Sequence, residues 1–429
     1  MSSNAEFIVS IDFGSTFTKV HHTISEIQAA PHAKQSVVHL CKFGNYSGSR
    51  NAPLVPSIIQ YDLAGNVVGW GYDPIVKGAV QIRGIKLCLP HEDDVTWDPT
   101  TYPVVAHANQ CRKNLRKTVL MVITDFMTRL WQVCRPQINT NNQPGMNWRL
   151  IITHPHGWGT DKLEQAIDAA IVKPDHGNGT YTICFQTEAE AALIAVLADR
   201  GNQGDHEGNG QPPASYHRPG GQVAQAQDGE TVVVLADFGG LTVDIASGRV
   251  NTQASITSLT EQAAPTSQIY GPSLLNNSFM SLLVNKVEML LSKPQIPDWY
   301  FRGLKEWEKR LLPRLAPGPS SDLTFSVAIE DFKKSTWMTH NRWAQHGELP
   351  IHSVEIESMM DYHIKKVTAA IEKQIKDLRG LGYTANYLCL TGGFSLNTYV
   401  GSQLKQLAST AQAVSRSVRN GPVWSGLKP

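Results

Sequence analysis

The sequence predicts an α/β protein made of two lobes, each built around a sheet with helices packed on it. Three observations lead to this prediction. The chain has 429 residues, which is more than a single hydrophobic core usually organises. Short apolar segments typical of buried strands alternate with longer segments whose apolar spacing is typical of helices. Two predicted strands, far apart in the sequence, end in the same kind of glycine turn, and we expect one such unit in each lobe.

The first lobe is predicted to cover residues 1–198. It opens with an apolar strand at residues 7–13, and residues 43–115, rich in glycine, proline and asparagine, are expected to form a small peripheral subdomain. The other elements expected here are strands at 17–24, 35–42, 148–153 and 181–185, and helices at 118–133, from 161, and at 188–197.

The second lobe is predicted to cover residues 231–429. Residues 199–230 precede it and are dominated by glycine, glutamine, proline and asparagine, a composition that indicates a flexible insertion. A peripheral subdomain is expected at about residues 263–349. The other elements expected here are strands at 231–237, 322–330 and 387–391, a mainly helical region at 273–315, and a long amphipathic helix at 354–378.

Charge and cysteine usage narrow the class of protein. The chain has 38 basic and 37 acidic residues, so its net charge gives no reason to expect a nucleic acid or an anionic membrane as partner. The sequence has no apolar run of about 18 residues and no secretory signal at its start. Six scattered cysteines fit a reducing compartment. We expect a cytoplasmic protein, with access to the nucleus and an unknown protein partner left open.

The two glycine turns carry the chemistry of the sequence. They read I11-D-F-G-S-T16 and A236-D-F-G-G-L-T242, so each has an acidic residue, an aromatic residue and a glycine in a row. A bound Mg-triphosphate needs amides that approach closely, hydroxyl donors and a carboxylate for the metal's waters. The residues that supply such groups are Asp12, Gly14, Ser15, Thr16, Asp237, Gly239, Gly240, Thr242 and Asp244. Each turn alone could be an ordinary strand end. Both together, with a third strand ending at Gly392-Gly393, favour a nucleotide site.

Longer motifs around these turns resemble a known family. The motifs are V9-S-I-D-F-G-S-T-F17, L235-A-D-F-G-G-L-T-V-D244 and L390-T-G-G-F394. They resemble the two phosphate motifs and the adenosine motif of the actin-like ATPase superfamily. Within it, the chain is most similar to the heat-shock protein 70-like proteins of the divergent heat-shock protein 12A-like branch. Smaller similarities follow in the family's order, at Pro56-Ser57, Ile85-Lys86-Leu87, Thr153-His154-Pro155, T187-E-A-E-A-A-L193 and E306-W-E-K-R310.

The resemblance implies a ribonuclease H-like fold with mixed five-stranded sheets flanked by helices and two peripheral subdomains. It implies ATP, ADP and Mg²⁺ as ligands, with Asp12 and Asp237 holding the metal through its waters. Lys86 and Glu188 would flank the γ-phosphate and orient the attacking water, and Thr242 and Asp237 would complete the catalytic group. The other residues implied in nucleotide binding are Gly14, Ser15, Thr16, Gly239, Gly240, Asp244, the adenine clamp of Glu306, Lys309 and Arg310, and Gly392 and Gly393.

One position departs from the family pattern. Leu241 stands where the second phosphate motif usually has a third glycine. A leucine with positive φ would cost about 1–2 kcal/mol, and with negative φ its side chain could crowd the γ-phosphate. In either case we expect slow hydrolysis that Leu241→Gly accelerates.

Three functions remain open from the sequence. The favoured one is a slow Mg-dependent ATPase switch without a substrate-binding domain. The alternative is a non-hydrolysing nucleotide-binding scaffold or sensor, and a small-molecule kinase is favoured least.

Overall fold

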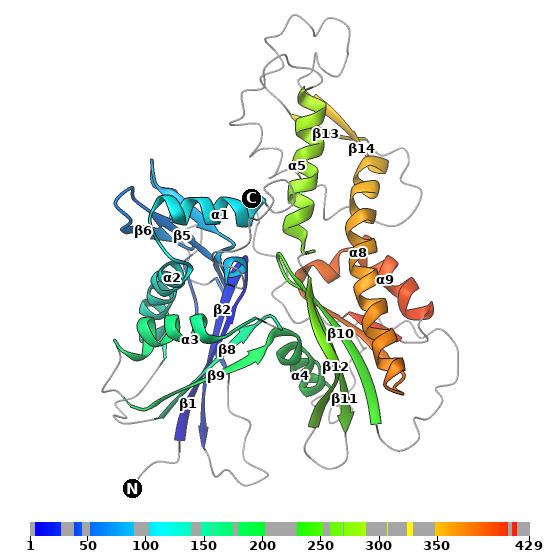
Figure 1. The fold of residues 1–429 in the computed structure, drawn as a ribbon, viewed down its shortest axis with the longest axis horizontal. Coiled ribbons are helices and arrows are strands. Elements are labelled where there is room, and N and C mark those ends of the chain that lie inside the picture. The colour runs from blue at the N-terminus through cyan, green and yellow to red at the C-terminus, as the bar shows by residue number, and fades with distance from the viewer. Residues whose placement is uncertain are drawn as a thin grey trace, which may run out of the picture.

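The structure, a computed structural model, describes residues 5–26, 38–44, 52–89, 103–138, 147–156, 158–174, 179–201, 230–251, 258–268, 270–288, 307, 324–328, 348–410 and 414–417. It is an α/β protein in which two mixed sheets are flanked by helices (Figure 1). We call residues 5–201 the first half and residues 230–417 the second half, because each contains one of these sheets.

The sheet of the first half has six strands. The order is β3-β2-β1-β8-β9, with β4 also paired to β2. The β1–β2 pair is antiparallel, and β1, β8 and β9 run parallel. The strands are β1 (Ala5–Phe13), β2 (Phe17–Glu26), β3 (His39–Leu40), β4 (Val55–Pro56), β8 (Asn147–His154) and β9 (Tyr181–Thr187).

The sheet of the second half repeats the same arrangement. Its order is β12-β11-β10-β15-β16, with β10–β11 and β11–β12 antiparallel and β10, β15 and β16 parallel. A central hairpin therefore begins each sheet and is followed by two parallel strands. The strands are β10 (Glu230–Phe238), β11 (Val243–Asn251), β12 (Ser258–Gln268), β15 (Tyr387–Thr391) and β16 (Val414–Ser417).

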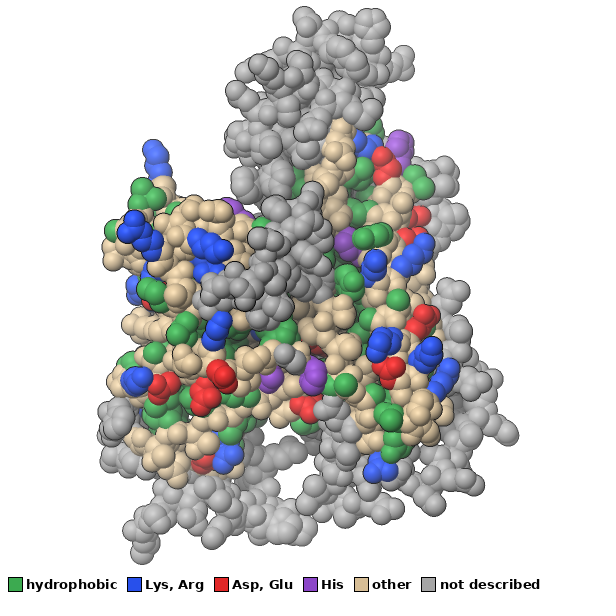
Figure 2. All heavy atoms as spheres, viewed as in Figure 1, with side chains coloured by type: hydrophobic (Ala, Val, Ile, Leu, Met, Phe, Trp, Pro, Cys, Tyr) green, Lys and Arg blue, Asp and Glu red, His purple; other side chains and the backbone are tan. Residues whose placement is uncertain are grey.

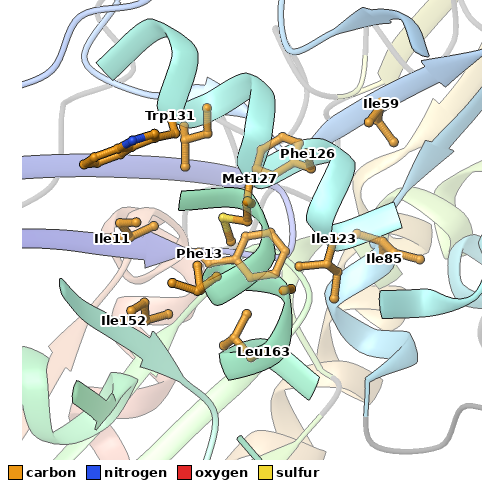
Figure 3. Packing of buried hydrophobic residues seen from close by; sticks show 14 of the residues in the cluster. Ile11, Phe13, Ile59, Ile85, Ile123, Phe126, Met127, Trp131, Ile152 and Leu163 are labelled. Carbon is orange, nitrogen blue, oxygen red and sulfur yellow. The ribbon is translucent and has the colours of Figure 1, made fainter. Parts of the chain in front are cut away.

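One large core holds the first half together. Helices α2 (Val119–Cys134) and α3 (Asp161–Ile167) cover one face of the sheet. Figure 3 shows Phe126 and Met127 of α2 packed against Phe13 of β1. The small sheet β6-β5-β7 belongs to the same core, since Ile59 and Ile82 are buried in it. Its strands and neighbours are β5 (Ile58–Tyr61), β6 (Val67–Trp70), β7 (Val80–Arg83), η1 (Ile85–Cys88) and α1 (Pro103–Asn114).

The second half has a core of its own beneath a long helix. Helix α8 (Ser353–Gly380) packs on the sheet beside α5 (Pro272–Glu288), with α9 (Thr398–Thr410) next to it. On the opposite side lies α4 (Glu188–Gly201), which belongs to the first half but packs on β10 and β11. In Figure 1, α4 lies between the two sheets and joins them. The remaining pair, β13 (Thr324–Ala328) and β14 (Glu348–His352), is antiparallel.

The structure confirms most of the predicted elements. The strands at 7–13, 17–24, 148–153, 181–185, 231–237 and 387–391 are present, as are the helices at 118–133, from 161, at 188–197 and at 354–378. The described residues of the strand predicted at 322–330 form β13. Of the strand predicted at 35–42, the described residues 38–42 contain only the two residues of β3. Of the helical region predicted at 273–315, the described part is α5 and the single residue Trp307.

Several predicted boundaries differ from the structure. The first sheet has six strands where five were expected, because β4 adds to its edge. Helix α4 continues to Gly201 and so enters the segment predicted as an insertion, and glycine is a common helix end. Strand β12 was not predicted, and the expected start of a peripheral subdomain near residue 263 falls inside it.

Candidate functional site

The two hairpin turns of the central strands lie against each other. Residues 14–16 join β1 to β2, and residues 239–242 join β10 to β11. A Cβ atom built on Gly240 would lie 2.1 Å from Oγ1 of Thr16. Only a glycine fits here, and the turns of the two halves therefore meet in direct contact.

Each hairpin brings one aspartate to this meeting point. Asp12 is the second-last residue of β1, and Asp237 is the second-last residue of β10. In register, Asp12 faces Lys19 of β2 and Asp237 faces Asp244 of β11. Residues opposite each other in an antiparallel pair point to the same side of the sheet. The two strand ends thus place Lys19 and three carboxylates at one junction.

The first turn is braced by its neighbours. Ser57 donates a hydrogen bond from Oγ to the Gly14 carbonyl at 2.7 Å, and its backbone N–H donates to the Thr16 carbonyl at 2.8 Å. On the next strand, Thr153 donates from Oγ1 to Oδ1 of Asp12 at 3.2 Å. These contacts fix both the turn and the carboxylate of Asp12.

Strand β15, which is followed by Gly392-Gly393, packs beside the second turn. Thr391 of β15 lies beside Asp237 in the parallel register. Gly392 follows with φ 82°, and a Cβ there would lie 2.2 Å from the Phe238 carbonyl oxygen and 2.8 Å from Oδ1 of Asp237. A left-handed φ and a close backbone both require glycine at this position.

Lys86 and Glu188 form an ion pair at the same junction. Lys86 lies on η1 and is buried, and Glu188 is the first residue of α4. The charge of Lys86 acts on Asp244 as well as on Glu188. The predicted catalytic lysine and glutamate are therefore together, and both face the aspartates of the two hairpins.

The junction carries more negative than positive charge. Burial, together with the nearby carboxylates of Glu188 and Asp12, raises the pKa of Asp237 to about 7. Burial likewise raises the pKa of Glu188, although Lys86 opposes this, and it raises the pKa of Asp244. Oδ1 of Asp244 is buried without a hydrogen-bond partner. By contrast, the face of the molecule in Figure 2 mixes positive and negative side chains over both halves.

The hydroxyl groups predicted to bind phosphate lie in the two turns. Ser15 and Thr242 are both buried, and Thr16 is half-buried. Gly239 is close to Thr242, since a Cβ on it would lie 3.1 Å from the Thr242 carbonyl oxygen. The predicted hydroxyls and glycines are therefore brought together as expected.

Leu241 does not have the strained backbone that was one of its two expected effects. Arg116 is the one non-glycine residue with positive φ in the described part of the chain, so leucine fits the backbone at 241. Its side chain is 2% exposed and belongs to the core of the first half. The expectation of a positive-φ penalty at this turn is therefore wrong.

The predicted adenine clamp lies outside the described residues, since Glu306, Lys309 and Arg310 are not among them. Trp307, between them in sequence, is buried, stacks on Phe279 of α5 and donates its indole N–H to Asn276 at 2.8 Å. On the side of Gly392, a small apolar pocket is lined by Phe238, Tyr270, His363, Ile364, Val367, Phe394, Val400 and Leu404.

One charged residue of the site was missed from the sequence. Lys19 faces Asp12 across the hairpin, and its charge lowers the pKa of Asp237 against the effect of burial. The signal was available, because alternation along a strand puts Lys19 on the side of Asp12 once the turn is placed at residues 14–16.

Comparisons add no family to this geometry. No known protein family has a model that matches the chain, and a search of curated proteins finds no match. Among the described helices, none is long and apolar enough to cross a membrane.

Proposed function

We propose that this chain binds Mg-ATP at the junction of its two sheets and hydrolyses it slowly, so that the nucleotide state changes how the halves fit together. The observation that carries the proposal is the meeting of two glycine turns, each with an aspartate at its strand end, beside the buried Lys86–Glu188 pair.

The sheet topology supports an actin-like ATPase fold for this proposal. Both sheets have the same order, a hairpin with a third antiparallel strand on one side and two parallel strands on the other. A repeat of this kind places two equivalent hairpins face to face. Both hairpins can then contact one phosphate chain.

The described residues fit a magnesium ion. Burial raises the pKa of Asp237 although the charge of Lys19 opposes this, and Oδ1 of Asp244 is buried without a hydrogen-bond partner, so a further cation at the junction would stabilise both carboxylates. No three His, Cys, Asp or Glu side chains of the described part form a direct metal-binding group, and Asp12 and Asp237 would hold the ion through its waters. Magnesium, when bound, neutralises charge on the phosphates and on the transition state.

The side chains of the junction then have separate roles in hydrolysis. The amides of residues 14–16 and 239–242 and the hydroxyls of Ser15, Thr16 and Thr242 bind phosphate oxygens. Lys86 places a positive charge beside the γ-phosphate, and Glu188 accepts a hydrogen bond from the attacking water. Gly392 and Gly393 let the backbone pass close to the adenosine.

A non-hydrolysing nucleotide sensor is the second candidate. It is favoured by the ion pair itself, because Lys86 lowers the pKa of Glu188 against the effect of burial and occupies the carboxylate that would accept a hydrogen bond from water. For hydrolysis, Lys86 would have to donate a hydrogen bond to the γ-phosphate as well as to Glu188, so that the Glu188 carboxylate can accept one from water. A single-turnover assay with labelled ATP separates the two functions.

Calorimetric titration of ATP with and without Mg²⁺ tests the proposed site. We expect Asp12→Ala and Asp237→Ala to weaken Mg-ATP binding much more than binding of metal-free ATP. Asp168→Ala, which removes an exposed carboxylate paired with Lys173 on the surface, is the matched control and should change neither. Equal losses with and without Mg²⁺ would remove the metal role of the two aspartates.

A further inference from the structure

Leu241 is the point at which the second half enters the core of the first half. It lies in the β10–β11 turn, yet its buried side chain belongs to a hydrophobic cluster whose other buried members lie between Phe7 and Ile171. In the described part of the chain, no other buried residue of the second half belongs to that cluster. The contact is therefore a single apolar side chain inserted from one half into the other.

The insertion reaches the segment that carries Lys86. A Cβ on Gly84 would lie 3.4 Å from Cδ1 of Leu241 and 2.9 Å from Cγ1 of Val104. Gly84 has φ 65° and immediately precedes η1, whose second residue is Lys86. The absence of a side chain at Gly84 makes room for Leu241 next to this helix.

The backbone of Leu241 is held just as firmly by its own half. Gly271 donates its N–H to the Leu241 carbonyl at 2.9 Å, and a Cβ on Gly271 would lie 2.6 Å from the Leu241 backbone. Gly271 directly precedes α5. Leu241 is thus fixed to α5 through its backbone and to the core of the first half through its side chain.

Helix α4 also links the two halves, but through the chain itself as well as through packing. Helix α4 follows β9 directly and packs Ala189 and Leu193 on the second sheet beside Val233 and Leu235. Because α4 is covalently part of the first half and packed on the second, it can act as the pivot. The Leu241 contact, held by burial alone, is the one that can separate.

We propose that Leu241 is a hydrophobic latch that keeps the two halves closed over the junction without any nucleotide. Burial of an apolar side chain is favourable whatever the ligand state, so closure does not wait for a bound phosphate chain. Without this side chain, the junction would depend, within the described residues, mainly on the contact between the turns and on the α4 link. The latch goes beyond the proposed ATP site and holds whether or not that site binds ATP.

The test measures the distance between the halves in the nucleotide-free protein. Spin labels at Leu63→Cys, in the turn after β5, and Val354→Cys, at the start of α8, report on opposite sides of the junction, and both positions are exposed. A Cys184→Ser background leaves five cysteines that are buried. We expect one short distance in this background, and a second, longer one in Leu241→Ala, with the open-to-closed ratio raised about 10- to 100-fold.

Three further variants and one ligand make the result decisive. Leu404→Ala removes a buried leucine from the second core alone and should leave the distance unchanged. Leu241→Met should stay closed, and Leu241→Val, the milder truncation if Leu241→Ala does not fold, should open partly. An unchanged distance in the truncated variants, or equal opening in Leu404→Ala, would overturn the latch. Adding Mg-ATP tests the proposed function separately, since failure to bind leaves the nucleotide-free result intact.

Discussion

The carboxylate of Asp237 gives the sharpest prediction, because two opposite effects follow from its removal. Asp237→Asn keeps the size of the side chain and removes its charge. Burial and the neighbouring Glu188 and Asp12 hold the pKa of Asp237 at about 7, against an ordinary 3.8. The folded protein therefore binds this proton more tightly than the unfolded chain does.

The sign of the pH dependence follows from this pKa. Between about pH 4 and pH 7 the folded state holds more protons at Asp237, so the free energy of unfolding falls as pH rises. A rise of about 3 pH units corresponds to about 4 kcal/mol at 1.36 kcal/mol per unit. Asp237 is only half-buried, and solvent screening reduces this to about 2 kcal/mol. Asp237→Asn should stabilise the nucleotide-free protein by about that amount at pH 8 and hardly at all at pH 4.

Urea unfolding at the two pH values, with and without Mg-ATP, checks the prediction. Without nucleotide, we expect the variant to unfold at higher urea than the natural protein at pH 8 and at the same urea at pH 4. With Mg-ATP at pH 8, we expect the variant to unfold at lower urea than the natural protein, because it lacks the Asp237 carboxylate that would hold the metal's waters. Asp168→Asn, on the exposed surface of the first half, is the control and should show neither effect. A destabilised variant at pH 8, or an equal gain at both pH values, would refute the electrostatic reasoning.

Three other substitutions test separate parts of the site. Glu188→Gln should slow single-turnover ATP hydrolysis about 100-fold or more by removing the base for water, with little change in ATP affinity measured by calorimetry. Gly240→Ala should push the turns apart, since its Cβ would lie 2.1 Å from Oγ1 of Thr16, and should weaken Mg-ATP binding more than tenfold. Gly380→Ala, where nothing lies within 4 Å of the new Cβ, should bind normally. Gly392→Ala should lower the melting temperature, because φ 82° costs a non-glycine residue about 1–2 kcal/mol and the Cβ meets the backbone of Phe238. A normal melting curve for it would show that the strand end can shift.

The central strands could be predicted because the apolar character of their own residues is enough to indicate a buried strand. β1, β10 and β15 lie inside their sheets, so their sequences are mostly apolar and each is followed by a glycine. The long amphipathic helices α2 and α8 have one apolar stripe each, which is a strong signal. The candidate site could be predicted as well, because its aspartates and glycines lie at the ends of these strands.

Strand β12 could not be predicted because its pairing with β11, and not its own sequence, makes it a strand. Its sequence, S258-L-T-E-Q-A-A-P-T-S-Q268, is polar and contains Pro265. It lies at the edge of the sheet, and its register with β11 shifts between the pairs at Ser247 and Ile245, beside Pro265. Edge strands tolerate proline at such irregularities, and only the presence of β11 makes the segment a strand.

The environment of Leu241 was also beyond the sequence. Comparison of residues 236–242 with the phosphate motif that they resemble suggests that Leu241 is strained or lies near the phosphates. In the structure, the Leu241 side chain instead fills the space left by Gly84 in the other half. That space exists only after both halves have folded and met. Local pattern alone does not show which core a turn residue will join.

The most direct test of the proposed function is a crystal structure with Mg²⁺ and a non-hydrolysable ATP analogue. The account predicts the triphosphate between residues 14–16 and residues 239–242, with the metal's waters on Asp12 and Asp237 and the adenosine beside Gly392-Gly393. An analogue bound elsewhere, or a junction in which Lys86 and Glu188 face no phosphate at saturating analogue, would contradict it.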